Sequence, residues 1–581
     1  MNKKDENVQA PNRRSWWLRE RWSFMITGAV LACLLILGLF ASTRPITVEP
    51  LDNPTTYRYP GESIAWEGCG HLKNGRRLEC STITVPIDQF TQNPEVTDAT
   101  FTIPLIRLRG HNATQNLLLN PGGPGGSGIW FMHRLGAELH TIVGEDFHLV
   151  AFDPRGVNGS RPLATCYPDA ETRRARGPVR DKRVLEDSPE LYAWSANYVR
   201  ACADTMGVHG MYLNTPQTAA DMNSILVALG QEDMVYWGFS YGTILGQTYA
   251  ALYPERSRRV IIDGVNNVFD WYSGLLDEED LVDSERVFDG FLEECVKAGR
   301  NCPLTHFGTS REVLRERILG LAETLYSEPV SVYVDNERYG VLDDRILLYE
   351  AIPTALRKSA TWPALARNLA LLLDGNATEA FLAYALDRKP WPKVGDAERF
   401  VMLNDGASGA KHWPGDRKTM LEWLVPFMNR SIFAPTEHGI YYAKQQWQIP
   451  KTHSFTPPHL VHTAHPLLIL TTSFDPVCPL ISARSAQRAF EGSQIVEVLG
   501  YGHCSTAVPS LCLARHVRAF LKDGIVPEAH VRCEVDEAYA YFPGTDDGEN
   551  GVELREVDGG LGDEEDVRLS DALVELARGA W

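Results

Sequence analysis

Apolar and polar positions along residues 61–269 follow two rhythms that replace each other in turn. Residues 101–108 alternate with a period of two, which indicates a strand, whereas Met222, Ile225 and Leu229 share one helix face within 218–229. Strands that alternate with helices form a parallel sheet with helices on both faces, so we expect an α/β fold. Short apolar runs between turn residues predict further strands at 116–119, 147–152, 234–239 and 259–262, and a helix at 243–252.

The alternation of strand and helix patterns stops over residues 270–450, which are expected to be mostly helical and loop-like and are rich in tryptophan and acidic residues. Strand patterns return at 466–472 and 495–499. A chain of 581 residues is too long for one small compact domain, and a core interrupted by a helical cap accounts for this pattern. We expect core over 61–269, cap over 270–450, core again over 451–535 and an acidic tail over 536–581.

An uncharged apolar stretch at residues 24–41 precedes the core, and about twenty such residues in a helix span a bilayer. Six Lys and Arg residues come before it and only Arg44 follows closely, so residues 1–22 are expected in the cytoplasm. The prediction is a transmembrane signal-anchor over 23–43, a stalk over 44–60 and a catalytic domain beyond the membrane. A signal peptide cut after Ala41, giving a secreted protein, is the alternative.

The formal net charge is −19, and residues 534–581 alone hold fifteen acidic residues against three Arg. Without a basic surplus to meet phosphates, a general nucleic-acid binder is excluded.

Cysteine usage agrees with export. Ten of the eleven cysteines lie beyond the apolar stretch, and an even number there is typical of a disulfide-bonded protein. Short loops make Cys69–Cys80 and Cys295–Cys302 the easiest pairs to propose, and no Cys/His group has the spacing of a zinc site. Glycosylation sequons, which fit the same route, stand at Asn112, Asn158, Asn376 and Asn429.

The sharpest catalytic motif is G-x-S-x-G at residues 238–242, between a predicted strand and a predicted helix. In that context it describes a nucleophile elbow, a tight turn that lifts the Ser240 hydroxyl above the strand ends. The N-terminus of the next helix favours negative charge that develops there. An ordinary Gly/Ser turn is the alternative.

A serine nucleophile needs a base to take its proton and a carboxylate to orient that base. Elbow folds supply them in the chain order Ser, Asp, His. Asp475 follows the predicted strand 466–472 and His503 follows 495–499, so both are expected at the sheet edge where Ser240 emerges. Asp263, after the predicted strand 259–262, is a rival carboxylate.

A glycine-rich loop, NPGGPGGSG at 120–128, follows the predicted strand 116–119. Such loops supply one oxyanion-hole N–H, and the residue after the nucleophile supplies the other, so Gly123 and Tyr241 are the expected donors. A phosphate-binding loop is the alternative, but the GK[ST] ending is missing.

Together the segments NPGGPGGSG, FDPRGVNGS, GFSYGT, SFDP and GYGHCS resemble the α/β-hydrolase serine peptidases of the prolyl iminopeptidase and tripeptidyl aminopeptidase type. Residues from Pro466 to about Cys533 resemble the tripeptidyl-aminopeptidase-like C-terminal domain of that family. The resemblance implies Ser240 as nucleophile, His503 as base and Asp475 as its orienting acid, with Gly123 and Tyr241 as the oxyanion hole. It also implies no metal or cofactor, and small peptides cut near their N-terminus as substrates.

Such an exopeptidase must recognise a free α-ammonium group. The acidic run at 277–280 offers Glu278 and Glu279 as candidate ligands, although a charged run is ordinarily a solvated helix face. Cys478 and Cys504 stand on the loops that carry Asp475 and His503, and we hypothesise that they pair, with Cys512–Cys533 as a neighbouring bridge. Two other functions stay open: an ester hydrolase with the same triad, and a non-enzymatic binding ectodomain.

Overall fold

The structure is a computed structural model of the chain, and it describes residues 56–91, 98–177, 179–386, 395–544 and 564–579. The predicted cytoplasmic segment and membrane anchor lie outside the described residues. Among the residues that are described, none of the helices is both long and apolar enough to cross a bilayer.

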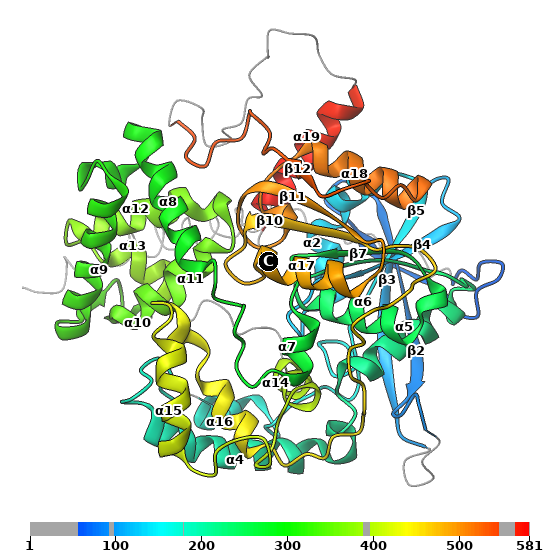
Figure 1. Cartoon of the computed structure of the whole chain (residues 1–581), viewed down its shortest axis with the longest axis horizontal. Helices are drawn as coiled ribbons and strands as arrows, with labels where there is room; N and C mark the ends of the chain where they lie inside the picture. Colours follow the sequence, from blue (N-terminus) through cyan, green and yellow to red (C-terminus); the bar gives the residue numbers. More distant parts are fainter. Residues whose placement is uncertain (1–55, 92–97, 178, 387–394, 545–563, 580–581) are drawn as a thin grey trace, which may run out of the picture. The chain divides into compact units, whose positions relative to one another are not determined.

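A ten-stranded sheet forms the centre of the chain, in the order β1-β2-β3-β5-β4-β6-β7-β10-β11-β12 (Figure 1). The pairs β1–β2, β2–β3 and β3–β5 are antiparallel, and every later pair in this order, from β5–β4 to β11–β12, is parallel. The strands are β1 (Glu67–His71), β2 (Arg77–Pro86), β3 (Thr100–Leu108), β4 (Gln115–Asn120), β5 (Phe147–Phe152), β6 (Met234–Phe239), β7 (Ser257–Asp263), β10 (Leu468–Phe474), β11 (Gln494–Tyr501) and β12 (Val531–Cys533).

Helices cover both faces of this sheet, which is why every residue of β5 and β6 is buried. One apolar cluster joins the sheet to α5, α6 and α17, and a second joins its other face to α2, α18 and α19. The predicted α/β core is therefore confirmed. These helices are α2 (Gly128–Val143), α5 (Thr215–Ala228), α6 (Tyr241–Leu252), α17 (Leu480–Ala489), α18 (Leu511–Asp523) and α19 (Glu564–Arg578).

The insertion between β7 and β10 is mostly helical, as expected (Figure 1). It also holds a β-hairpin, β8–β9, that the sequence pattern does not reveal. Its helices bury an apolar cluster of their own. The elements are α7 (Val268–Ser273), α8 (Ser284–Ala298), α9 (Arg311–Ser327), β8 (Val330–Tyr333), β9 (Tyr339–Leu342), α10 (Asp344–Ile346), α11 (Ile352–Leu356), α12 (Trp362–Leu373), α13 (Thr378–Ala380), α14 (Ala397–Asp405), α15 (Arg417–Met428) and α16 (Gly439–Gln446).

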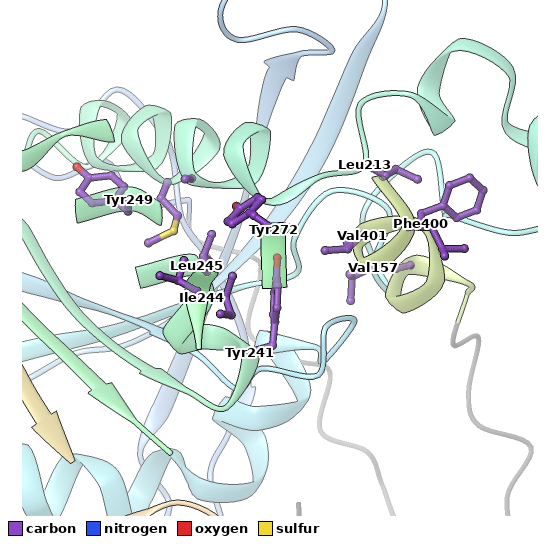
Figure 2. Packing of buried hydrophobic residues seen from close by; sticks show 14 of the residues in the cluster. Val157, Leu213, Tyr241, Ile244, Leu245, Tyr249, Tyr272, Phe400 and Val401 are labelled. Carbon is purple, nitrogen blue, oxygen red and sulfur yellow. The ribbon is translucent and has the colours of Figure 1, made fainter. Parts of the chain in front are cut away.

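The cap also draws on a second segment, between β5 and α5. This segment carries α3 (Ala170–Arg176) and α4 (Ser188–Gly210), and α4 packs along α16. Figure 2 shows how α14 joins the two parts, with Phe400 and Val401 beside Leu213 and Val157. Cap and core therefore share one apolar cluster on this side.

The acidic tail returns to the core at its C-terminal end. Helix α19 lies on α2 and α18 and buries Leu569, Leu573 and Leu576. Its outer face forms ion pairs from Glu565 to Arg518 and from Asp566 to Arg515. The tail thus ends in an amphipathic helix that completes one face of the core.

Candidate active site

The strand order brings three loop ends to one edge of the sheet. Only β7 separates β6 from β10, and β10 pairs directly with β11. In a parallel sheet the carboxyl ends of these strands lie on the same edge. The loops that follow β6, β10 and β11, which carry Ser240, Asp475 and His503, are therefore neighbours.

Ser240 occupies a strained turn between β6 and α6. Its backbone has φ 56° and ψ −124°, a conformation that L-residues rarely adopt and that marks functional sites. The Ser240 N–H donates to the Asp263 carbonyl oxygen at 2.9 Å, which ties the turn to β7. Glycine is needed at 238 because a β-carbon there would lie 2.4 Å from the Gly242 carbonyl oxygen. This is the geometry of a nucleophile elbow.

The structure brings Asp475 and His503 into direct contact. His503 Nδ1 lies 3.0 Å from each carboxylate oxygen of Asp475. Asp475 is fully buried, and it also accepts the N–H groups of Val477 and Cys478 at 2.9 Å and that of Cys504 at 2.8 Å. Three backbone N–H donors fix the position of the carboxylate, so it can orient the imidazole.

His503 is placed by the cap as well as by the core. Its N–H donates to the carbonyl oxygen of Arg357 in the cap at 2.8 Å. The preceding Gly502 donates to the Phe474 carbonyl oxygen at 3.0 Å, and its own carbonyl accepts the Thr472 hydroxyl at 2.7 Å. The loop that carries the imidazole is thus bound on both sides.

Ser240 and His503 share Cys478 as a neighbour. The ring of His503 hydrogen-bonds to Asp475, while the Ser240 side chain interacts with the Cys478 thiol. The Cys478 sulfur and a nitrogen of His503 lie within 4.8 Å of each other. Cys478 therefore lies next to both Ser240 and His503. Catalytic hydrogen bonds are often long before substrate binds and tighten in the complex.

The rival carboxylate, Asp263, does not touch the imidazole. It is fully buried, and it accepts the N–H and the hydroxyl of Ser505, both at 2.7 Å. Burial raises the pKa of Asp263 to about 6, against the lowering effect of these hydrogen bonds. Asp263 therefore supports the loop after His503, and Asp475 orients the ring.

The glycine-rich loop lies directly against the elbow. A β-carbon on Gly122 would lie 2.3 Å from the Phe239 carbonyl oxygen and 2.9 Å from the Ser240 β-carbon, so only glycine allows this approach. The Gly122 N–H donates a hydrogen bond to Asn120 Oδ1 at 2.9 Å. Among the described residues, the N–H groups of Gly123 and Tyr241 donate to no protein acceptor. Both are thus available to an oxyanion.

The acidic segment before α8 approaches the site, but not through the residues that the sequence singles out. Glu278 is half exposed and paired with Arg430, and Glu279 accepts the Ser482 hydroxyl at 2.6 Å. Asp283 lies near Asp475, since burial and then the Asp475 charge raise the pKa of Asp283 to about 6. Asp280 is also close, because its charge acts on the Cys478 thiol.

The hypothesised bond between Cys478 and Cys504 is wrong, because both are free buried thiols. The two loops adjoin, but Cys504 Sγ faces the Asp263 carbonyl oxygen at 3.5 Å while Cys478 faces Ser240. Neighbouring loops do not by themselves align two sulfurs. The predicted bonds Cys69–Cys80, Cys295–Cys302 and Cys512–Cys533 are confirmed, and Cys166–Cys202 is a further one.

Two buried carboxylates that anchor the site were given no role from the sequence, although Asp153 lies in the quoted segment FDPRGVNGS. Asp153 accepts the Ser127 hydroxyl at 2.5 Å and the Ile129 N–H at 3.2 Å, which fixes the start of α2 beside the glycine-rich loop. Asp405, from the cap, accepts the Thr215 N–H at 2.8 Å, and Thr215 in turn bonds the Tyr241 hydroxyl at 2.6 Å. Burial raises the pKa of Asp405 to about 6.

Comparison with known proteins agrees with this geometry. Residues 115–303 match the α/β hydrolase fold family, and residues 439–533 match the TAP-like protein family. The chain is 28% identical to the serine protease Hip1 of Mycobacterium tuberculosis over 81% of this chain and 91% of that protein. It is 26% identical to the tripeptidyl aminopeptidase of Streptomyces lividans over 81% and 86%, and 25% identical to carboxylesterase B of M. tuberculosis over 86% and 98%.

Proposed function

We propose that this serine hydrolase, which matches the α/β hydrolase fold and TAP-like families, releases short peptides or single residues from the N-termini of small peptides. The observation that carries this proposal is the contact between His503 and Asp475 beside the Ser240 elbow. Hydrolysis then follows an acyl-enzyme route.

In the first half-reaction the Ser240 hydroxyl attacks the scissile carbonyl and His503 takes its proton. The oxyanion that forms is held by the N–H groups of Gly123 and Tyr241, assisted by the N-terminus of α6. His503 then gives the proton to the leaving amine. In the second half-reaction water attacks the acyl-enzyme with His503 again as base, and Ser240 is regenerated. Asp475 stabilises the imidazolium in both steps, because its charge is buried against Nδ1.

Recognition of the substrate α-ammonium falls to the acidic segment before α8. Asp280 and Asp283 are the carboxylates of this segment whose charges act on Cys478 and Asp475. A cation held there would relieve the repulsion between Asp283 and Asp475. Glu279 supports the segment through Ser482 on α17.

The predicted N-terminal anchor would hold the catalytic domain at the outer or lumenal face of a membrane, and cleavage of that segment would give a secreted protein. Four disulfides among the described residues support this location, since such bonds persist in oxidising compartments.

The deciding experiment is digestion of an unbiased peptide mixture with products identified by mass. We expect cleavage confined to positions near free N-termini, no cleavage of N-acetylated copies, and loss of activity by several orders of magnitude in Ser240→Ala. Asp280→Asn and Asp283→Asn should raise KM for peptides with a free N-terminus more than they lower kcat. Internal cuts, or equal cleavage of acetylated peptides, would rule out the exopeptidase.

Ester hydrolysis is the second candidate, because carboxylesterase B is among the relatives and acyl transfer to serine needs the same groups. Comparing an aminoacyl arylamide with a short acyl ester separates the two. Turnover of the ester alone would favour the esterase.

A further inference from the structure

Cys478 stands at the catalytic centre without a role in the acyl-transfer steps. It is a free thiol with no exposed surface, and its side chain interacts with the nucleophile Ser240. One ligand atom each from Cys478, Asp475 and His503 lie within 4.8 Å of one another, and all three residues are buried. A thiol, an imidazole and a carboxylate that converge in this way form a donor set for a borderline or soft divalent ion.

We propose that Cys478, His503 and Asp475 form an inhibitory binding site for Zn²⁺ or a similar thiophilic divalent ion, inside the catalytic centre of the proposed peptidase. Only the inhibition of catalysis by the bound ion rests on the proposed function. The binding itself depends on the three side chains alone.

The geometry needs only a small adjustment. Zinc holds sulfur at about 2.3 Å and nitrogen or oxygen at about 2.0–2.2 Å in a tetrahedron, so its ligand atoms lie about 3.5 Å apart. The separations here, at most 4.8 Å, close to that value with movements of about 1 Å. Three protein ligands leave the fourth position to water or to the Ser240 hydroxyl, which already contacts Cys478.

The electrostatic surroundings favour a cation. Asp475 and Asp280 place negative charge at the thiol, opposed by Arg357. Binding forms a zinc–sulfur bond and breaks the S–H bond of Cys478, whose proton leaves to the solvent. No oxidant or reductant is needed. Ser240 is partly exposed, and the buried His503 keeps 9% of its side-chain surface accessible, so the ion would enter from the side of Ser240, as the substrate does.

The bound ion blocks catalysis because it occupies groups that must be free. A ring nitrogen that binds the metal cannot move the serine proton, and a carboxylate shared with the metal orients the ring less well. The other Cys/His cluster in the described part of the chain, Cys512, His516 and Cys533, does not compete, because its two sulfurs are joined in a disulfide.

Cadmium titration of the intact wild-type protein tests binding directly. We expect the ultraviolet charge-transfer band of a cadmium–thiolate at one ion per chain, removed by Zn²⁺, and absent in Cys478→Ser and Cys478→Ala. Cys504→Ser is the matched control, since Cys504 is an equally buried free thiol outside the cluster, and it should keep the band. Absence of the band in wild type, or its survival in both Cys478 variants, would overturn the site.

Inhibition is measured by the rate at which Ser240 reacts with a fluorophosphonate probe, which needs a working serine hydrolase but no particular substrate. Zn²⁺ should slow labelling, a chelator should restore it, and Cys478→Ser should raise the inhibitory concentration by about tenfold or more. An equal inhibitory concentration in Cys478→Ser would refute inhibition through this thiol. If wild type binds cadmium but never reacts with the probe, the proposed function fails while the metal site stands.

Discussion

Replacing Asp475 by Asn tests which of two buried carboxylates, Asp475 or Asp263, orients His503. Asp475 Oδ1 accepts the N–H groups of Val477 and Cys478, and Oδ2 accepts that of Cys504, while both oxygens face His503 Nδ1. An Asn side chain that keeps its oxygen toward Val477 must turn its NH₂ group toward the Cys504 N–H and the ring.

This contact between two groups of donors should lower both the rate of catalysis and the stability of the fold. The imidazole then prefers the tautomer with its proton on Nε2, so it cannot take the Ser240 proton, and kcat should fall by about 10⁴-fold, or roughly 5.5 kcal/mol. The unmade hydrogen bond of the Cys504 N–H should lower the free energy of unfolding by about 1–3 kcal/mol. The loss of rate is therefore larger than the loss of stability can explain.

Asp263→Asn is the matched control, since Asp263 is equally buried and bonds Ser505 instead of the ring. Its kcat should stay within about tenfold of wild type, because the Asp475–His503 pair is intact. The assays are steady-state arylamide hydrolysis, the fluorophosphonate labelling rate and thermal unfolding of each variant. The reasoning is refuted if Asp263→Asn slows the enzyme as much as Asp475→Asn does.

Two further outcomes test the buried carboxylate of the cap and the C-terminal helix. The pKa of Asp405 is raised from 3.8 to about 6, so its favourable contribution is complete below pH 3.8 and is lost as the pH rises through about 6. In parallel denaturant titrations, wild type should gain stability relative to Asp405→Asn, by up to roughly 3 kcal/mol, as the pH falls from 7 toward 4; a constant difference would contradict the shift. Leu573→Ala in α19 should cost about 2–5 kcal/mol of unfolding free energy with kcat largely kept, whereas the exposed Asp571→Ala should cost little; equal costs would mean that α19 does not pack on α2.

The sequence predicts the features that depend on residues close together in the chain. Buried parallel strands such as β5 and β6 are short apolar runs, and the elbow is a five-residue pattern set by the glycines beside Ser240. The disulfides Cys69–Cys80 and Cys295–Cys302 close loops of 11 and 7 residues, where few other partners are within reach. Chain order and fold topology together select Asp475 and His503, two residues that the structure brings into contact.

Features set by distant partners were missed. The contact of Asp405 with Thr215 spans 190 residues, and no periodicity connects them. Arg155 pairs with Asp221 at 2.6 Å with both side chains fully buried, a pairing that composition cannot reveal. The Cys478–Cys504 error has the same origin, because the topology fixes which loops are neighbours but not the direction in which each sulfur points.

These long-range contacts also change the role of the cap. The Arg357 carbonyl holds the backbone of His503, and the Ser284 hydroxyl donates at 2.8 Å to the Pro476 carbonyl oxygen, next to Asp475. Asp405 fixes Thr215 and, through it, the side chain of the oxyanion residue Tyr241. Each of these cap residues touches a segment that carries a catalytic group, and none has to contact the substrate. A cap that only selected substrates would alter KM when changed, whereas a cap that holds the base, its orienting acid and the oxyanion residue must alter kcat as well. In the proposed mechanism the insertion therefore completes the catalytic apparatus, and the proposed recognition of the substrate is a second task of the same segment.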